Sequence, residues 1–359
     1  MSPSRRPFRG REGLVLSLGL WSLAAWGVLR FFPRDPGRLS NRAAIEAAGI
    51  MAEAMASIRA CREASGPAIE RTTDPNRTGL IGVEDSPVTT SPGHLEAKRT
   101  TTNPNFAAAL VLLLREAGAG PGDTVAVAAS SSFPGLILAT LAASKALAIR
   151  PLLIVSLGAS NWGANDPRWT WLEISDCLSR SGLVEARPLA VSVGGEGDEG
   201  RDMPPRVRDL LEAKIEASGI PRIGESDLAS GVAARLRLFE AAAAGTRLKA
   251  FVNVGGSWVN MGADSDILKL QPGVNRTMSL PPPERRGLIQ EMSGRGIPVI
   301  HLLYVRGLAE KFGLPWDPAP LPGPGKKPGN SPAARTAVLA VYLAGLILAG
   351  IQSRRLASR

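Results

Sequence analysis

Strand, turn and helix signals follow one another closely between Asp123 and Val155, and this order constrains the fold more than any other feature of the sequence. Thr124–Ala128 has the pattern of a buried strand, Ser130–Ser132 forms a turn, and Pro134 suits the first position of a helix. Arg150–Val155 is then a second strand. Because the connection is one helix long, we expect the two strands to be parallel and joined by a right-handed crossover.

Three further segments have the pattern of strands. Leu80–Val83 is short and apolar, Lys249–Val254 runs into Gly255–Ser257, and Ile297–Val305 precedes a helical turn. Strands separated by helices predict an α/β domain, whose mostly parallel sheet has helices on both faces as a three-layer sandwich. Gly194–Gly200 is rich in glycine and carboxylates, so we expect an exposed loop without a phosphate-binding role.

Apolar runs at the two ends predict one transmembrane helix at each end. Gly13–Val28 follows four arginines and precedes Arg30 and Pro33, which fits a signal anchor; a cleavable signal peptide is the alternative. Thr336–Ile351 holds no charge and lies between arginines. A buried C-terminal helix is the alternative there, but a helix that is apolar on every face favours the membrane.

The predicted organisation has seven parts. They are a basic cytoplasmic tail (1–12), a transmembrane anchor (13–32), a helical stalk (33–77), the α/β domain (78–313), a Pro/Gly-rich linker (314–334), a second transmembrane helix (335–352) and a second basic tail (353–359). The stalk contains a predicted Ala-rich helix from Ser40 to Arg62.

The net charge of +10 and the pI near 10.3 would be typical of a nucleic-acid-binding protein if the positive charge lay on the folded domain. Its distribution along the sequence argues otherwise. Residues 1–32 hold five arginines and one glutamate, and residues 335–359 hold four arginines, which leaves 33 basic and 31 acidic residues between them. The excess therefore flanks the apolar runs, where it favours a membrane partner and both ends inside the cytoplasm. We expect the domain outside the cytoplasm and no nucleic-acid partner.

Cysteine and histidine are scarce. Cys61 and Cys177 could form one bridge in an oxidising compartment, but their spacing does not demand it, and two unpaired thiols are the favoured interpretation. With only His94 and His301 and no cysteine cluster, no metal-ligand spacing appears. The sequence therefore predicts neither a metal site nor a cofactor.

Three polar turns follow predicted strands, at the edge of the sheet where ligands of open α/β sheets bind. They are Ser130–Ser132, Ser156–Asn161 and Gly255–Ser257. The first also begins a helix, whose free N–H groups favour an anion. The predicted ligand-binding residues in these turns are Ser130, Ser131, Ser132, Ser160, Asn161, Gly255, Gly256 and Ser257. The alternative is that these hydroxyls only cap helices and turns.

Two adjacent cations, Lys98 and Arg99, precede a helix that starts near Asn105. Among neighbouring threonines and asparagines they could clamp an acidic substrate, and we include both among the predicted ligand-binding residues. The alternative is a solvated helix face.

A serine hydrolase is a further hypothesis, because Ser131 or Ser132 lies on a strand-to-helix turn, as the nucleophile of an elbow does. The Gly-x-Ser-x-Gly pattern is absent, however, and a base is scarce. His94 would pair with Ser131 as the catalytic residues; Lys98 as an unusual base, or Asp264 or Asp266, are the alternatives. His301 lies mid-strand, which is typical of a packed core histidine.

Several separate segments resemble one bacterial family, the poly-gamma-glutamate system protein. The segments are Gly79–Glu84, Thr89–Thr90, Leu95–Thr100, Asn103–Ala107, Ser130–Pro134, Ser156–Asn165 and Asn253–Ser257, and the likeness covers about residues 40–313.

The resemblance implies membership of a locus that makes or exports a capsular or secreted poly-gamma-glutamate polymer at the bacterial inner membrane, with a ligase and other membrane proteins as partners. It implies no catalytic residues. We therefore predict a membrane-anchored accessory protein whose domain binds acidic polymer or a glutamate-like ligand. A serine-dependent amidase acting on the polymer and a solute-binding domain for a small acidic ligand are the alternatives.

Overall fold

The structure is a computed structural model, and it describes residues 11–31, 39, 41–325, 339–349 and 351. The chain divides into two compact units. One comprises Gly37–Lys326, and the other combines Met1–Pro36 with Lys327–Arg359. The predicted tails and residues 326–334 of the predicted linker lie almost wholly outside the described residues.

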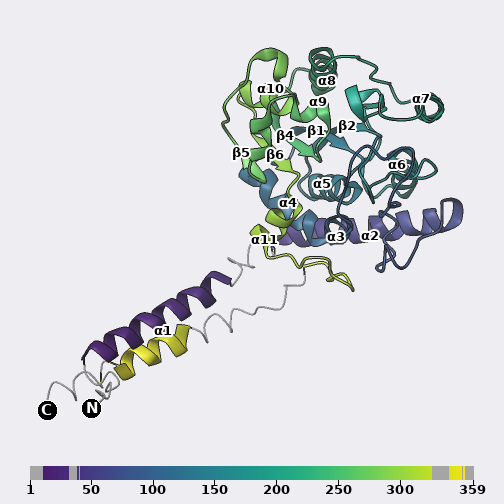
Figure 1. The fold of residues 1–359 in the computed structure, drawn as a ribbon. Coiled ribbons are helices and arrows are strands. Elements are labelled where there is room, and N and C mark those ends of the chain that lie inside the picture. The colour runs from purple at the N-terminus through teal and green to yellow at the C-terminus, as the bar shows by residue number, and fades with distance from the viewer. Residues whose placement is uncertain (1–10, 32–38, 40, 326–338, 350, 352–359) are drawn as a thin grey trace, which may run out of the picture. The chain divides into compact units, whose positions relative to one another are not determined.

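The larger unit is built on a six-stranded sheet (Figure 1), counted over the described part of the chain. Its strand order is β3-β2-β1-β4-β6-β5. The strands are β1 (Thr124–Ser130), β2 (Arg150–Ser156), β3 (Ala190–Ser192), β4 (Leu248–Val254), β5 (Gly273–Asn275) and β6 (Val299–Leu302). All pairings are parallel except that of β5 with β6. The predicted α/β class with a mostly parallel sheet is therefore confirmed.

The helices cover both faces of the sheet, because alternate residues of each strand pack into different cores. Val125 and Val127 belong to one hydrophobic cluster, and Ala126 and Ala128 to the other. The first cluster contains residues of α2 (Arg42–Ser65), α4 (Asn105–Glu116), α5 (Pro134–Ala146), α6 (Trp171–Ser181), α7 (Pro205–Ser218) and α11 (Val305–Phe312). The second contains residues of α8 (Leu228–Ala243), α9 (Trp258–Met261) and α10 (Leu288–Gly294).

Short elements complete the unit. They are the helix α3 (Leu95–Thr101) and the 3-10 helices η2 (Glu196–Asp198), η3 (Ser265–Lys269) and η4 (Pro283–Arg285). The prediction of a strand at Leu80–Val83 is wrong, because this segment pairs with a loop and not with the sheet. Gly82 N donates to the Trp162 carbonyl, and Trp162 N donates to the Val83 carbonyl.

The helix expected as a stalk is instead part of the packed unit. In α2 half of the buried residues are alanines, with Met51 and Ile58 also fully covered, whereas Ile45 remains 43% exposed. Small side chains allow α2 to lie close against α4 and α5, its main neighbours. The packed unit also extends past Gly313, because Asn105 Oδ1 accepts from Gly325 N at 2.9 Å, in the predicted linker. Sequence periodicity revealed the helix but not what covers it.

Cys61 and Cys177 form a disulfide bond between α2 and α6, so the expectation of two unpaired thiols is wrong. Their separation of 116 residues is bridged because α2 packs across the helical layer beside α6. Sequence spacing could not show this, since the pairing depends on how two helices pack.

The smaller unit contains α1 (Arg11–Phe31) and a helical segment at residues 339–349, which lie side by side in Figure 1. The hydroxyls of Ser22 and Tyr342 are 3.1 Å apart. Within the residues that the structure describes, no helix is both long enough and apolar enough to cross a membrane. This finding does not support the two predicted spans.

Removing the disulfide should destabilise the larger unit. We expect the double variant Cys61→Ala/Cys177→Ala to lose about 2–5 kcal/mol of unfolding free energy, because the unfolded chain is no longer constrained by the bridge. Guanidinium unfolding of the full chain measures this loss, and thiol titration of the unfolded wild type should find no free thiol. Equal midpoints for wild type and double variant would contradict the prediction.

Candidate functional site

A cavity of about 1010 Å³ lies where the parallel strands end. Its lining comes from the ends of five of the strands and from the loops after them. These residues are Ser130, Ser132 and Phe133 at β1, Ser156, Gly158 and Ser160 at β2, Gly195, Glu196 and Asp202 after β3, Gly256–Trp258 after β4, and Leu303–Arg306 after β6. Residues 90–94 and 96–98, with Trp316, complete the lining. Parallel pairing brings all carboxyl ends to one edge, so five loops meet there.

Lys98 is the most unusual residue of the cavity lining. Its side chain comes from α3, is only 2% exposed, and donates from Nζ to Ser160 Oγ at 2.6 Å and to the Ser132 carbonyl at 2.5 Å. The amine also lies 3.7 Å from the centre of the Phe133 ring. Burial lowers the pKa of Lys98 from 10.5 to about 7. An amine with this pKa changes its charge near neutral pH.

Arg99 does not share the cavity with Lys98, so the predicted two-cation clamp does not form. Its guanidinium donates to both carboxylate oxygens of Asp317, with Nε to Oδ1 at 2.7 Å. The hydrogen bond with Asp317 raises the pKa of Arg99. The physical reason is helical geometry, because successive residues of a helix point about 100° apart.

The three serines at the end of β1, Ser130 to Ser132, also point in different directions. Ser130 and Ser132 line the cavity, whereas Ser131 is fully buried and donates its hydroxyl to the Ser156 carbonyl at 3.0 Å. Alternation along an extended chain explains the difference. The Ser130 hydroxyl has no hydrogen-bond partner among the described residues although Ser130 is only 4% exposed. The predicted nucleophile Ser131 therefore makes a structural hydrogen bond and does not line the cavity.

Of the other predicted ligand-binding residues, Ser160, Gly256 and Ser257 line the cavity. Asn161 instead joins two loops, because its Oδ1 accepts from Gly93 N at 2.9 Å and its amide donates to the Glu84 carbonyl. Gly255 has φ +81°, and a Cβ atom there would lie 2.3 Å from Ser130 Oγ, so only glycine fits. Gly255 does not line the cavity itself, but it lies against Ser130, which does.

None of the histidines and carboxylates considered as bases is both buried in the cavity lining and in contact with a cavity serine. His94 is exposed and lines the cavity. His301 is buried, 3.1 Å from the Asn253 amide, and burial lowers its pKa from 6.5 to about 4, so the ring is neutral. Asp264 accepts from the Asp266 backbone at the start of η3, and Asp266 is paired with Lys269 at 2.7 Å.

The loop Gly194–Gly200 is largely buried, so the expectation of an exposed loop is wrong. Asp198 is 5% exposed and pairs with the buried Arg235 of α8. The hydroxyls of Ser156 and Ser192 both bond to Asp198 Oδ1, at 3.0 and 2.8 Å. This ion pair fixes the loop in place, so that Gly195 and Glu196 line the cavity.

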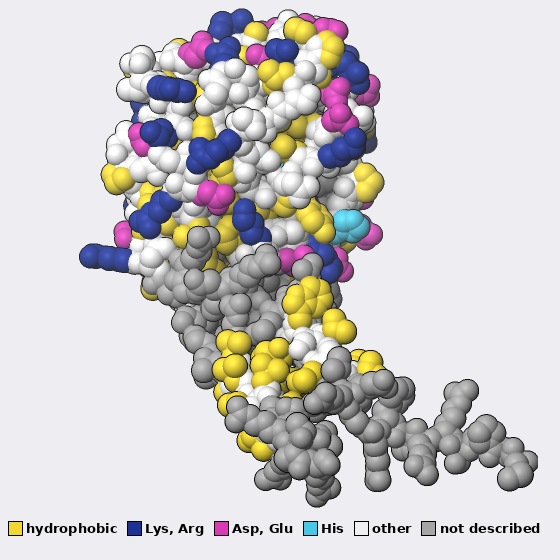
Figure 2. Space-filling model, turned by 90° about the vertical axis from the view of Figure 1, so that its left-hand side faces the viewer, with side chains coloured by type: hydrophobic (Ala, Val, Ile, Leu, Met, Phe, Trp, Pro, Cys, Tyr) yellow, Lys and Arg dark blue, Asp and Glu magenta, His cyan; other side chains and the backbone are white. Residues whose placement is uncertain are grey.

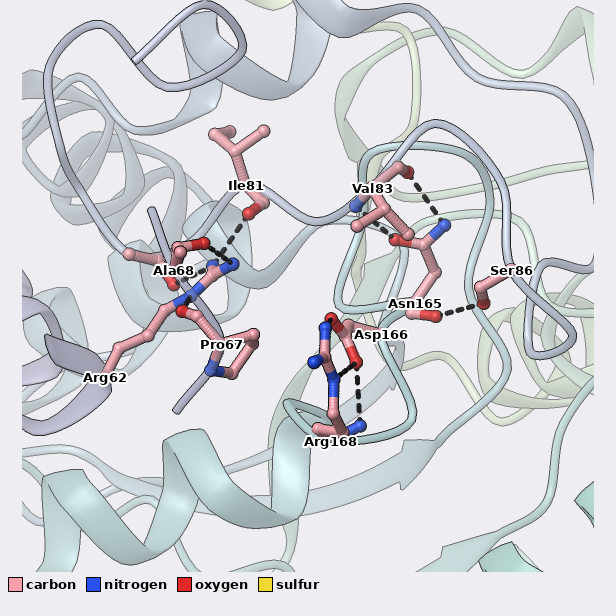
Figure 3. A network of polar contacts seen from close by, with 10 residues as sticks. Arg62, Pro67, Ala68, Ile81, Val83, Ser86, Asn165, Asp166 and Arg168 are labelled. Atoms are coloured by element: carbon pink, nitrogen blue, oxygen red, sulfur yellow. Dashed lines mark hydrogen bonds and ion pairs between the residues drawn. The ribbon is translucent and has the colours of Figure 1, made fainter. Parts of the chain in front are cut away.

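A second network holds the loop that carries Ser160 (Figure 3). The Asn165 side chain pairs with the Val83 backbone through both its oxygen and its amide, at 3.0 and 2.9 Å. Arg62 of α2 donates to the Ile81 carbonyl at 2.8 Å. Residues 79–83 are therefore hydrogen-bonded to Arg62 of α2 through the Gly79 and Ile81 carbonyls, and to the Ser160 loop through Val83. Two buried polar networks thus position the loops around the cavity.

Sequence reasoning missed several lining residues, notably Phe133, Trp258, Tyr304, Arg306 and Trp316. A signal was present for Tyr304 and Arg306. The predicted strand Ile297–Val305 runs three residues past the end of β6 at Leu302, so the turn after it was not recognised as a site loop. For Trp316 no local signal existed, because it reaches the cavity from the segment expected as a linker.

Comparison of the chain with family models, with curated proteins and with solved structures gives no match. The resemblance to the poly-gamma-glutamate system protein therefore remains a prediction.

The low pKa of Lys98 should make stability depend on pH. Between pH 7 and 10.5 the unfolded chain binds the Lys98 proton more tightly than the folded chain does, so the free energy of unfolding should rise with pH across this window. Lys98→Met should remove this part of the rise, and the exposed Lys249→Met should retain it. Urea unfolding at several pH values measures the difference. Parallel curves for wild type and Lys98→Met would show that burial does not perturb the amine.

Proposed function

We propose that the cavity binds a ligand bearing a carboxylate, and that Lys98 neutralises it. The observation that carries the proposal is the buried Lys98 amine, whose described partners are a carbonyl, a hydroxyl and an aromatic face, none of them negatively charged. A buried cation without an opposite charge is costly, and an anionic ligand removes that cost. Ligand binding would then raise the pKa of Lys98 again.

Two further features support an anion at this position. Ser130 lines the cavity, and its buried hydroxyl is a donor for which the described residues provide no acceptor. The 13-residue helix α5 begins at Pro134 directly after Phe133, so the positive end of its dipole faces the same region.

The charge distribution limits the kind of anion. Glu96, Glu196 and Asp202 also line the cavity, and Lys98 is its one buried cation among the described residues. A single carboxylate fits this arrangement better than a long run of them. We therefore propose that the cavity takes one glutamate-like unit or the end of an acidic chain, and not the middle of an extended polyanion.

The polymer system is part of the same proposal. The segments that resemble the poly-gamma-glutamate system protein supply Thr90, Lys98, Ser130, Ser160 and Ser257 to one cavity, although they are distant in the sequence. This convergence is what a shared ligand site would require. The accessory protein of a polymer-synthesis locus, with other membrane proteins as partners, is the function we propose.

We further propose that the smaller unit anchors the chain in the inner membrane. Both of its helices expose large apolar side chains, yellow in Figure 2; Leu20, Leu23 and Trp26 are more than 60% exposed, as are Ile347 and Leu348. Side chains of this kind are covered in a folded protein, and lipid would cover them. The apolar runs Gly13–Val28 and Thr336–Ile351 support the same proposal. A disulfide in the larger unit supports its location outside the cytoplasm.

Ligand binding should be visible as stabilisation. We expect γ-linked glutamate oligomers to stabilise the full chain by about 2.7 kcal/mol at a hundredfold excess over Kd, and so to raise its melting temperature. Lys98→Met should abolish the rise because it removes the positive charge, whereas Lys249→Met should leave it unchanged. γ-Linked oligomers in which every carboxylate, including that of the terminal unit, is replaced by a carboxamide are the matched ligand control. An equal rise with both kinds of oligomer would refute recognition of the carboxylate.

Membrane topology should follow the predicted orientation. We expect the chain to fractionate with bacterial inner membranes, and a cysteine at the exposed position Glu216 to react with an impermeant maleimide in spheroplasts. A cysteine at Ser2 should react only after permeabilisation. Labelling of both positions only after permeabilisation would place the domain in the cytoplasm, and recovery of the chain in the soluble fraction would refute the anchor.

A further inference from the structure

We propose that Ser160 and Lys98 form a nucleophile–base pair that transfers an acyl group from an amide or ester held in the cavity. The proposal rests on the carboxylate-binding site proposed above, and it assigns to that site a reaction, a nucleophile and a base. Lysine is an attested partner of serine nucleophiles, although histidine is more common.

The geometry fits a nucleophile and its base. Ser160 Oγ is 2.6 Å from Lys98 Nζ, within the usual hydrogen-bond range for such a pair. Both side chains are buried, at 6% and 2% exposure, yet both line the cavity. The two residues come from segments 62 positions apart, so the contact is a tertiary one.

The surroundings hold the pair in place. Ser160 N donates to Ser132 Oγ at 3.0 Å, and the Ser132 carbonyl accepts from Lys98. The turn after β1 therefore contacts both members of the pair. Ser156 also lines the cavity and bonds to Asp198, but that carboxylate is paired with the buried Arg235. Among the described contacts of the other cavity-lining serines none joins a hydroxyl to a base, so Ser160 is the nucleophile we assign.

The protonation state of Lys98 suits a base at neutral pH. Without an anion beside it, burial brings its pKa to about 7, so a substantial fraction of molecules carries the neutral amine, which can accept a proton. A carboxylate paired with Lys98 raises this pKa and lowers that fraction, so acyl transfer proceeds from the molecules in which the amine remains neutral. The titratable and charged groups that share the cavity are Glu96 and His94 around α3, Glu196 and Asp202 after β3, and Tyr304 and Arg306 after β6. The neighbouring Arg99 is paired with Asp317.

The reaction balances with water as the only co-reactant. Neutral Lys98 takes the proton of the Ser160 hydroxyl while Oγ forms a bond to the substrate carbonyl carbon. The tetrahedral intermediate then breaks its C–N or C–O bond, and the Lys98 ammonium returns a proton to the leaving group. Water attacks the resulting ester, Lys98 accepts the proton of that water, and Ser160 Oγ recovers it as the ester bond breaks.

Ser130 is placed to assist as a donor. Ser130 lines the same cavity and its buried hydroxyl has no partner in the part of the chain that the structure describes, so it can donate to the oxygen that becomes negative in the intermediate. Removing one such donor typically lowers the rate by about 100- to 1000-fold.

The test uses the full chain in detergent with its disulfide intact, and a fluorophosphonate that reacts with activated serines. We expect one phosphonate adduct, located on Ser160 by mass spectrometry, and a labelling rate that rises with pH through about 7 and then levels off. Ser160→Ala should abolish labelling. Lys98→Met should lower the rate by at least about 100-fold, as expected when a general base is lost.

Matched variants separate chemistry from folding. Ser144→Ala removes a buried, unpartnered serine far along α5, and Lys249→Met removes an exposed lysine; both should label at the wild-type rate. Lys98→Arg keeps a cation but cannot accept a proton at neutral pH, so it should bind glutamate oligomers and fail to label. If both Lys98 variants melt far below wild type, the pH profile of the wild-type rate still decides the matter.

The outcomes distinguish this proposal from the binding function. Stabilisation by glutamate oligomers without labelling of Ser160 would overturn the acyl transfer and leave the binding site standing. Labelling of Ser160 without that stabilisation would support the pair and overturn the acidic ligand. Release of nitroaniline from glutamate γ-nitroanilide, lost in Ser160→Ala, would support both, and labelling of any other serine would refute the assignment.

Discussion

The parallel pairing of β1 with both β2 and β4 is the constraint on which the site depends. Parallel strands need a crossover between them, and each crossover leaves the carboxyl end of its strand beside those of its neighbours. Ser130, Ser156 and Gly255 therefore begin loops at one edge, although they are spread over more than a hundred positions of the chain. The β6 loop and the segment around α3 then close the cavity from outside the sheet.

Keeping an amine buried inside this cavity requires rigid surroundings. A lysine surrounded by mobile loops would move its charge to water, because its long side chain can follow the solvent. Here Arg235 with Asp198 fixes the loop after β3, and Asn165 with Arg62 fixes residues 79–83 against the Ser160 loop. Both arginines are themselves buried and fully engaged, so the loops are held by interactions that are costly to break. The low pKa of Lys98 follows from its burial, which these two networks help to maintain.

The disulfide and the buried face of α2 give the helical layer a function beyond covering the sheet. Cys61 lies one residue before Arg62. The disulfide to α6 and the hydrogen bonds to residues 79–81 are therefore both made by the same turn of α2. A change in the packing of α2 would reach the cavity through the Ile81 and Val83 backbone. A bridge of this kind suits a protein that works in an oxidising compartment beside a membrane, as proposed for this chain.

The sequence by itself determined the elements that depend on local patterns. Four strands, the helix opening at Pro134 and the polar turns after the strands follow from periodicity and turn chemistry, and the edge of the sheet where the site lies follows from the rule for parallel strands. Only the tertiary structure decided which way each side chain points and what lies opposite it. It separated Lys98 from Arg99, turned Ser131 away from the cavity, paired Cys61 with Cys177 and brought Ser160 to the buried amine. Burial and pairing between distant segments arise from packing, and no local pattern encodes them.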